Sequence, residues 1–518
     1  MQSLHIGRDP LTFADIEAVA FGHQEVCLTP EAIERITEAS DYIRERAQSG
    51  DAIYGVTTGF GANRDTVIRP EDAEILQERL LISHACGLGN PLPEEVVRAM
   101  MLLRVNALSQ GMSGIRLSTL QLLIDMLNRR VHPTVPEFGS VGASGDLCPL
   151  AHMCLPLIGL GEVSHQGRTL PGDQGLALAG LQPTRLTYKE GLALLNGTQA
   201  MTALGVVVVR RALQLVDCAD AVGAMSLEAV AGRLEALDER IHLARRRPGQ
   251  IVSAAHVRTM LQGSELAGAP SGSIQGKHDY VQDSYCLRCM PQVHGACRDV
   301  LTHVVGILET EANAVTDNPL VFTPCEEDPD GSILSGGNFH GQPVAMALDY
   351  LKVALAEIGS ISERRCAKLT DKHFSEGLPA FLISNPGLNS GMMIPQYVAA
   401  ALVSENKSRA HPASVDSIPT SANMEDHVSM GMHAGLHALS IVRNAEKVLG
   451  IEYLISAQAL DLRPQRKAPA TQDALDLLRA QVSFMHEDRV MYPDMEKAIG
   501  LVQSGRLAQV IRPWLRGE

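Results

Sequence analysis

Residues 344–365 read VAMALDYLKVALAEIGSISERR, and their apolar side chains recur at the spacing of one face of an α-helix. This stretch lies in one of three long intervals that are bounded by prolines and contain none: 183–248, 343–379 and 419–464. A helix of about 30 residues spans about 45 Å. Because helices of that length bury their apolar stripes by lying side by side, the sequence predicts a mainly α-helical fold, built as a bundle of long helices.

The N-terminal part of the chain has a different pattern of residues. Glycine and proline interrupt shorter segments at 53–65, 83–93 and 136–152. We expect residues 1–190 to form a loop-rich head, where functional side chains tend to lie, and residues 191–518 to form the long-helix body. The two parts are expected to share a soft boundary within one cooperative unit.

The composition is that of a large globular chain. It has 518 residues, of which 45% are hydrophobic, enough for a sizeable core. The net charge of -15 argues against nucleic acid or an anionic membrane as a partner, because both attract clustered cations. The N-terminus lacks the pattern of a signal peptide, and prolines break the apolar stretch 147–160. Ten cysteines without framework spacing favour reduced thiols, so we expect a cytoplasmic protein.

The segment GSVGASGDLCPLAHM, residues 139–153, holds the most informative turn. Its small residues permit a tight turn in which the Gly145 amide nitrogen approaches the carbonyl carbon of Ala143. Attack there closes a five-membered ring, and loss of two waters, one of them carrying the Ser144 hydroxyl, leaves a methylidene-imidazolone. Such a group is an electrophile of a kind that the standard side chains lack. A simple helix cap with Asp146 at the positive end of the dipole is the alternative, and on this turn alone it is favoured.

Eight segments, taken together, reverse that preference, because they resemble the histidine and aromatic amino acid ammonia-lyase family in order and spacing over residues 10–500. They are YGVTTGFG (54–61), SHACG (83–87), GASGDL (142–147), LLNGTQA (194–200), VQDSYCLRCMPQ (281–292), EANAVTDNPL (311–320), GGNFHGQP (336–343) and SANMEDHVSM (421–430). The resemblance implies a mainly helical homotetramer of aspartase/fumarase-like architecture, with each active site assembled from three subunits. It also implies that Ala143, Ser144 and Gly145 form the 4-methylidene-imidazol-5-one prosthetic group.

The family's reaction needs a base and a cation. The resemblance makes Tyr54 the catalytic base, on a glycine-rich loop that can close over substrate, where nearby dipoles or cations would lower the tyrosine pKa. It assigns the substrate carboxylate to Arg288, whose guanidinium can donate two parallel hydrogen bonds. Gln282 and Tyr285 would support the intermediate. Without the resemblance, Tyr54 reads as a loop anchor and Arg288 as part of an ion pair between subunits.

The family's remaining site positions concern the electrophile and the substrate side chain. Asn196 would support the electrophile and the substrate, and Phe339 would shield the prosthetic group, although either could be a core residue. His84 and Glu425 would hold an imidazole between them, whereas lyases of phenylalanine or tyrosine typically carry glutamine in place of Glu425. The resemblance therefore implies deamination of L-histidine to trans-urocanate and ammonia, the first step of histidine degradation. Met393 also matches histidine lyases.

Other activities stay open at this point. A histidine 2,3-aminomutase, an ergothionase or another aromatic amino acid ammonia-lyase would use the same fold and electrophile. A metal-dependent hydrolase with ligands His433, His437 and Glu425 is the alternative from another class, and Cys286 and Cys289 loosely imitate a zinc cluster together with His294 and Cys297. Because the histidine pair lacks the HExxH glutamate and the cysteine group lacks a second CxxC, we expect no metal site.

The sequence departs from the family pattern at several positions around the expected site. Cys286 stands where serine is usual, Ser284 where histidine lyases often have proline, and Cys86 where alanine is usual. Met424 replaces a common glutamine, and Ala413 replaces a histidine. None of these changes removes a catalytic group, but together they leave open the substrate and the outcome as lyase or mutase.

Overall fold

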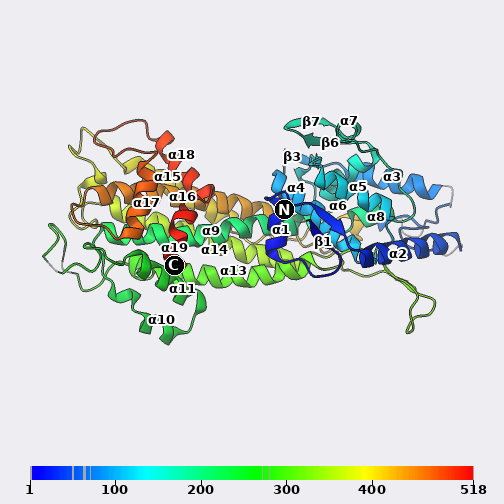
Figure 1. Ribbon diagram of the computed structural model, residues 1–518, viewed down its shortest axis with the longest axis horizontal. Helices are drawn as coiled ribbons and strands as arrows, with labels where there is room; N and C mark the ends of the chain where they lie inside the picture. The colour runs from blue at the N-terminus through cyan, green and yellow to red at the C-terminus, as the bar shows by residue number, and fades with distance from the viewer. Residues whose placement is uncertain are drawn as a thin grey trace. The chain divides into compact units, whose positions relative to one another are not determined.

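The computed structural model describes residues 3–49, 52–61, 66–69, 72–270, 272–278 and 280–516. Helices dominate these residues, and the strands are short (Figure 1). The long helices are α9 (Gln199–Ala229), α13 (Met290–Ala312), α14 (Gln342–Thr370) and α16 (Gly431–Asp461). The predicted mainly α-helical fold with long helices is therefore confirmed. The helices α9 and α16 lie within two of the proline-free intervals, and α14 begins at Gln342, one residue before the third.

Two compact units share the chain. Unit 1 comprises residues 1–207, 305–349 and 412–436, and unit 2 comprises residues 208–304, 350–411 and 437–518. The four long helices each contribute residues to both units. The boundary expected near residue 190 stays a prediction.

Unit 1 combines short helices with small sheets. Its helices are α1 (Phe13–Ala20), α2 (Pro30–Gln48), α3 (Ala73–His84), α4 (Glu94–Ser109), α5 (Leu117–Asn128), α6 (Leu147–Cys154), α7 (Gly172–Leu178) and α8 (Glu190–Leu195). Its strands are β1 (Leu4–Ile6), β2 (Val26–Leu28), β3 (Leu88–Pro91), β4 (His132–Pro133), β5 (Pro136–Phe138), β6 (Glu162–His165), β7 (Arg168–Pro171), β8 (Leu320–Phe322) and β9 (Ser332–Leu334). They pair as β1-β2 in parallel and as β3-β5, β4-β6-β7 and β8-β9 in antiparallel fashion.

Unit 2 is helical in its described part. Besides its portions of the long helices it holds α10 (Glu239–Arg245), α11 (Pro248–Met260), α12 (Tyr285–Arg288), α15 (Met393–Arg409), α17 (Pro469–Arg479), α18 (Tyr492–Gln503) and α19 (Arg506–Arg516). A buried carboxylate joins three of the long helices here. Glu452 on α16 accepts hydrogen bonds from Ser226 on α9 (2.6 Å) and from Ser362 and Arg365 on α14 (2.6 and 2.8 Å). These contacts place the three helices side by side, as the bundle prediction required.

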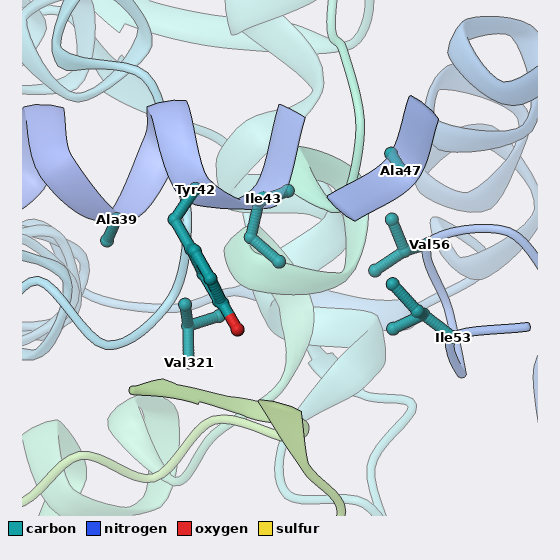
Figure 2. Packing of buried hydrophobic residues seen from close by; sticks show 7 residues of the cluster. All are labelled: Ala39, Tyr42, Ile43, Ala47, Ile53, Val56 and Val321. Carbon is teal, nitrogen blue, oxygen red and sulfur yellow. The ribbon is translucent and has the colours of Figure 1, made fainter. Parts of the chain in front are cut away.

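The helix α2 positions the loop that carries Tyr54. It begins at Pro30, after Thr29 accepts a hydrogen bond from the Ala32 amide at 3.3 Å, the arrangement of a helix N-cap. Its apolar face packs against that loop and against β8 in one buried cluster (Figure 2). The cluster consists of Ala39, Tyr42, Ile43, Ala47, Ile53, Val56 and Val321. Because Ile53 and Val56 flank Tyr54, the cluster fixes the loop on both sides of that residue.

None of the described helices is long and apolar enough to cross a membrane.

Candidate active site

The turn at residues 142–145 is one that only glycine permits at its two ends. Gly142 has φ +69° and Gly145 has φ +73°, both in the left-handed region. A Cβ added at Gly145 would lie 2.2 Å from the carbonyl oxygen of Gly197, and one added at Gly142 would lie 2.2 Å from the Ser429 hydroxyl. The chain therefore bends at the predicted small residues, and its surroundings leave no room for a side chain at either end of the bend. The approach of the Gly145 nitrogen to the Ala143 carbonyl carbon stays a prediction.

Asp146 directly follows this turn and holds it through hydrogen bonds. Its amide donates to the Gly197 carbonyl at 2.7 Å, and its buried carboxylate accepts from the Met201 amide at 2.8 Å and the Ser140 hydroxyl at 2.9 Å. Burial raises the pKa of Asp146 to about 6, although these hydrogen bonds act in the opposite direction. Asp146 occupies the N-cap position of α6 without a side-chain bond to that helix, and its carboxylate serves the first turn of α9 instead.

Ser144, at the tip of the turn, contacts two of the predicted site residues. Its hydroxyl donates to Glu425 Oε1 at 2.9 Å, and its carbonyl oxygen accepts from Asn196 Nδ2 at 2.8 Å. Asn196 is held in turn by Arg104, whose fully buried guanidinium donates to the Asn196 carbonyl at 2.7 Å. The Oδ1 atom of Asn196 is buried and has no hydrogen-bond partner among the described residues. A hydrogen-bond acceptor beside the turn therefore lacks a donor among the described residues.

Glu425 and His84 are each oriented by their own segment of chain. The Thr420 hydroxyl donates to Glu425 Oε2 at 2.8 Å, and the Thr420 amide donates to the Glu425 carbonyl at 3.0 Å. His84 ends α3, and its Nδ1 lies 2.9 Å from the Leu80 carbonyl oxygen. Burial lowers the pKa of His84, while the Leu80 carbonyl and the charge of Glu425 act the other way. Burial therefore favours the neutral form of this imidazole.

Tyr54 lies on a loop whose backbone is folded on itself. The Gly61 amide donates to the Tyr54 hydroxyl at 3.2 Å, and the tyrosine ring meets the Phe60 ring edge to face, with centroids 6.4 Å apart. The Thr57 hydroxyl accepts from the Ile53 amide at 2.8 Å. The predicted segment 53–65 continues into residues 62–65, which lie outside the described residues.

One cavity of about 860 Å³ in unit 1 brings six of the predicted site residues together. They are Tyr54, His84, Ser144, Asn196, Phe339 and Glu425. Ala143 and Gly145 belong to the turn that presents Ser144. The cavity wall also includes Arg79, Leu147 and Met424. A pocket that combines apolar walls with a few convergent polar groups suits a small amphipathic ligand.

The other three predicted residues belong to unit 2 and are not part of this cavity. Gln282 and Arg288 line a separate hollow of about 380 Å³, together with Asp283. The Arg288 guanidinium lies 4.8 Å from the centre of the Tyr285 ring and donates to the Asp283 carbonyl at 3.3 Å. Tyr285 is 71% exposed. In a single chain, Gln282, Tyr285 and Arg288 therefore lie at the surface, where a ligand or a partner can reach them.

Sequence reasoning missed two supporting residues. Arg104 is a fully buried charge within the apolar helix α4, and a lone arginine in the run MMLLRVNAL was a signal that could have been followed. Thr420 carried no such signal, because a threonine five positions before a glutamate in a loop is common. The described residues contain no group of three or more histidine, cysteine or acidic side chains arranged to hold a metal ion.

Known proteins are similar to this chain over most of its length. Residues 11–480 match the model of the aromatic amino acid lyase family. The histidine ammonia-lyase of Caldanaerobacter subterraneus subsp. tengcongensis is 48% identical to this chain over 513 residues, which cover 99% of each protein. The crystal structure of histidine ammonia-lyase from Trypanosoma cruzi is similar, with a TM-score of 0.89, 39% identity and coverage of 99% of this chain and 96% of that one. The structure of a tyrosine aminomutase from Streptomyces globisporus is also similar, with a TM-score of 0.92, 36% identity and coverage of 99% and 98%.

Proposed function

The chain belongs to the aromatic amino acid lyase family, and from that premise we propose that it is a carbon–nitrogen lyase that converts L-histidine to trans-urocanate and ammonia. The contact of 2.9 Å between the Ser144 hydroxyl and Glu425 carries the proposal. It puts a carboxylate, suited to an imidazole N–H, beside the residue from which the electrophile would form. His84 lines the same cavity and supplies a second group that can bind an imidazole nitrogen.

The residues of the turn fit a methylidene-imidazolone formed from Ala143, Ser144 and Gly145. Gly145, the residue whose nitrogen would close the ring, stands where a Cβ would clash with Gly197. The Ser144 carbonyl, which would remain in the ring, already receives a hydrogen bond from Asn196. The group, when formed, supplies an electrophilic methylidene carbon conjugated with that carbonyl. The Asn196 amide would withdraw electron density from the carbonyl and so support the electrophile.

The other residues would hold the substrate and move its proton. We assign the imidazole to His84 and Glu425, the removal of the β-proton to Tyr54, and the shielding of the electrophile to Phe339. Tyr54 and Phe339 line the same cavity as Ser144, which supports these two assignments.

Arg288, Gln282 and Tyr285 would come from a neighbouring copy. The substrate carboxylate requires a cation, and Arg288 is the arginine that the family's motif assigns to it. We therefore propose a homotetramer in which each active site combines residues of three subunits. The ten cysteines are all free, which fits a protein of the reducing cytoplasm.

A second activity of the same cavity is amine migration. The similarity to a tyrosine aminomutase favours keeping a histidine 2,3-aminomutase as a candidate. An ergothionase, which would eliminate an amine from a relative of histidine, stays a candidate because the chain is also similar to the ergothionase of Treponema denticola. A metal-dependent hydrolase is no longer a candidate, because residues 11–480 match the aromatic amino acid lyase family and the similar chains named above are ammonia-lyases, an aminomutase or an ergothionase.

Incubation of the purified protein with histidine, phenylalanine, tyrosine and ergothioneine tests the proposal. Formation of urocanate from histidine alone, monitored by its ultraviolet absorbance, supports a histidine lyase. Formation of β-histidine would assign a mutase, and no product from histidine would overturn the proposal. Ser144→Ala, which cannot form the methylidene group, is expected to abolish turnover.

A further inference from the structure

The hydrogen bonds of His84 decide which of its nitrogens carries the proton. Nδ1 lies 2.9 Å from the carbonyl oxygen of Leu80, one turn earlier in α3. Because a carbonyl oxygen only accepts, this contact is a hydrogen bond when Nδ1 carries the proton. The Ser83 hydroxyl, 3.0 Å from Nδ1, also lies 3.2 Å from the Leu80 carbonyl and can direct its own proton there. In the neutral ring Nε2 therefore presents a lone pair and acts as an acceptor.

Glu425 is a second acceptor on the same cavity. Its Oε2 receives the Thr420 hydroxyl at 2.8 Å, and its Oε1 receives the Ser144 hydroxyl at 2.9 Å. The Ser144 hydroxyl is one of the groups lost when the turn dehydrates. Oε1 then keeps a lone pair without a donor, beside the cavity.

A neutral imidazole cannot satisfy two acceptors, because it has one N–H and one lone pair. If a neutral ring bound between His84 Nε2 and Glu425 Oε1, its own lone pair would face the lone pair of one of these two acceptors. One hydrogen bond would then be missing, which weakens binding. We propose that the cavity binds the substrate ring as an imidazolium cation, with one N–H donated to Glu425 and the other to His84. This inference rests on the proposed function and adds the protonation state of its substrate.

The described residues of one chain bring few other charged groups to the cavity. Arg79 on α3 also lines it, but its side chain is exposed, so water screens its repulsion of a cation. Tyr54 lines the cavity, and Glu425 is the carboxylate among the described lining residues. Arg288 of a neighbouring copy is assigned above to the substrate carboxylate, which would neutralise its charge. These groups therefore permit one cationic ring next to Glu425.

The cationic ring also assists the removal of the β-proton. When the Cβ–H bond breaks, its electron pair moves into the adjacent ring, and the proton goes to Oη of Tyr54, the base assigned above. An imidazolium becomes neutral in this step, whereas a neutral imidazole would become an anion. The separation of charge is smaller in the first case, so the same base removes the proton more easily.

Proton uptake on binding measures the charge of the bound ring. We would titrate the full-length protein with 3-(imidazol-4-yl)propionate, which has no amine to lose, by calorimetry in two buffers of different ionisation enthalpy. Near pH 8.5 the free ring is mostly neutral, since imidazole pKa values lie near 6.5, and binding should take up close to about one proton per ligand. Near pH 5 the uptake should approach zero. No uptake near pH 8.5 together with proton release near pH 5 would overturn the inference.

Two further comparisons locate the proton. Methylation of either ring nitrogen of the ligand removes one donor and should weaken binding at least about tenfold. An equal affinity for one of the two methylated ligands would contradict the double-donor arrangement. Glu425→Gln should take up clearly less than one proton, after intact mass has shown that its turn has lost two waters. A full proton taken up by that variant would also count against the inference.

The two proposals fail separately. Urocanate formed by a protein that takes up no proton would remove the imidazolium and leave the lyase in place. A dehydrated protein that forms no product from histidine would remove the lyase, whatever its proton uptake.

Discussion

Two carboxylates in the molecule, Glu452 in unit 2 and Glu425 in unit 1, differ in how completely they are satisfied. Glu452 is fully buried, and two serine hydroxyls and the Arg365 guanidinium occupy its oxygens. Glu425 lies at the edge of a cavity, and one of its two donors is the Ser144 hydroxyl, which ring formation would remove. The comparison teaches that a completed polar cluster holds helices together, whereas an incomplete one is available to a ligand.

The largest effect is expected on the free energy of unfolding when the buried cluster around Glu452 is disrupted. Glu452→Gln leaves the buried Arg365 guanidinium without a counter-charge, which should lower the free energy of unfolding by about 3 to 5 kcal/mol. Urea unfolding at fixed protein concentration measures it. Glu405→Gln, at an exposed pair with Arg409 on α15, is the control and should cost less than about 1 kcal/mol. Equal losses in the two variants would show that the cluster around Glu452 is not structural.

The second effect tests the incomplete cluster. Glu425→Gln should lower kcat/KM for histidine by about 10²- to 10³-fold, because a charged acceptor for the substrate ring is lost. Its unfolding free energy should stay within about 1 kcal/mol of the parent protein, since the side chain is not fully buried. Steady-state kinetics and urea unfolding measure the two quantities. Unchanged turnover would remove Glu425 from the substrate site.

The smallest expected effect is on kcat/KM when Thr420, the residue that orients Glu425, is changed. Thr420→Val removes the hydroxyl that donates to Oε2 but keeps the shape of the side chain, and should lower kcat/KM by about tenfold. Thr37→Val makes the same change on the exposed face of α2, where the hydroxyl donates to the Ile33 carbonyl, and should leave the kinetics unchanged. A Thr420 variant with parental kinetics would show that Glu425 needs no such support.

The sequence was informative where local chemistry decides the structure. The periodic apolar residues 344–365 predicted the helix that became α14, and the small residues 142–145 predicted the tight turn. Both follow from backbone geometry and burial, which neighbouring residues determine. The grouping of His84 and Glu425 came from family resemblance and could not come from periodicity.

Contacts between segments that are distant in the sequence could not be predicted. Ser144 and Glu425 are 281 positions apart, and the carboxylate of Asp146 bonds to the start of α9 instead of to α6, which it precedes. Such pairings depend on how loops are brought together by packed helices, and a single sequence shows only which positions are buried. The buried Arg104 could have been suspected, but its partner, the Asn196 carbonyl, could not.

The central claim is that the turn at 143–145 dehydrates, and the intact mass of the purified protein tests it most directly. The parent protein should lack the mass of two water molecules. Gly145→Ala, whose Cβ would meet Gly197 at 2.2 Å, should retain both, whereas Gly167→Ala, at a left-handed glycine with nothing within 4 Å, should lose them as the parent does. A catalytically active protein with the full mass of its unmodified chain would contradict the account.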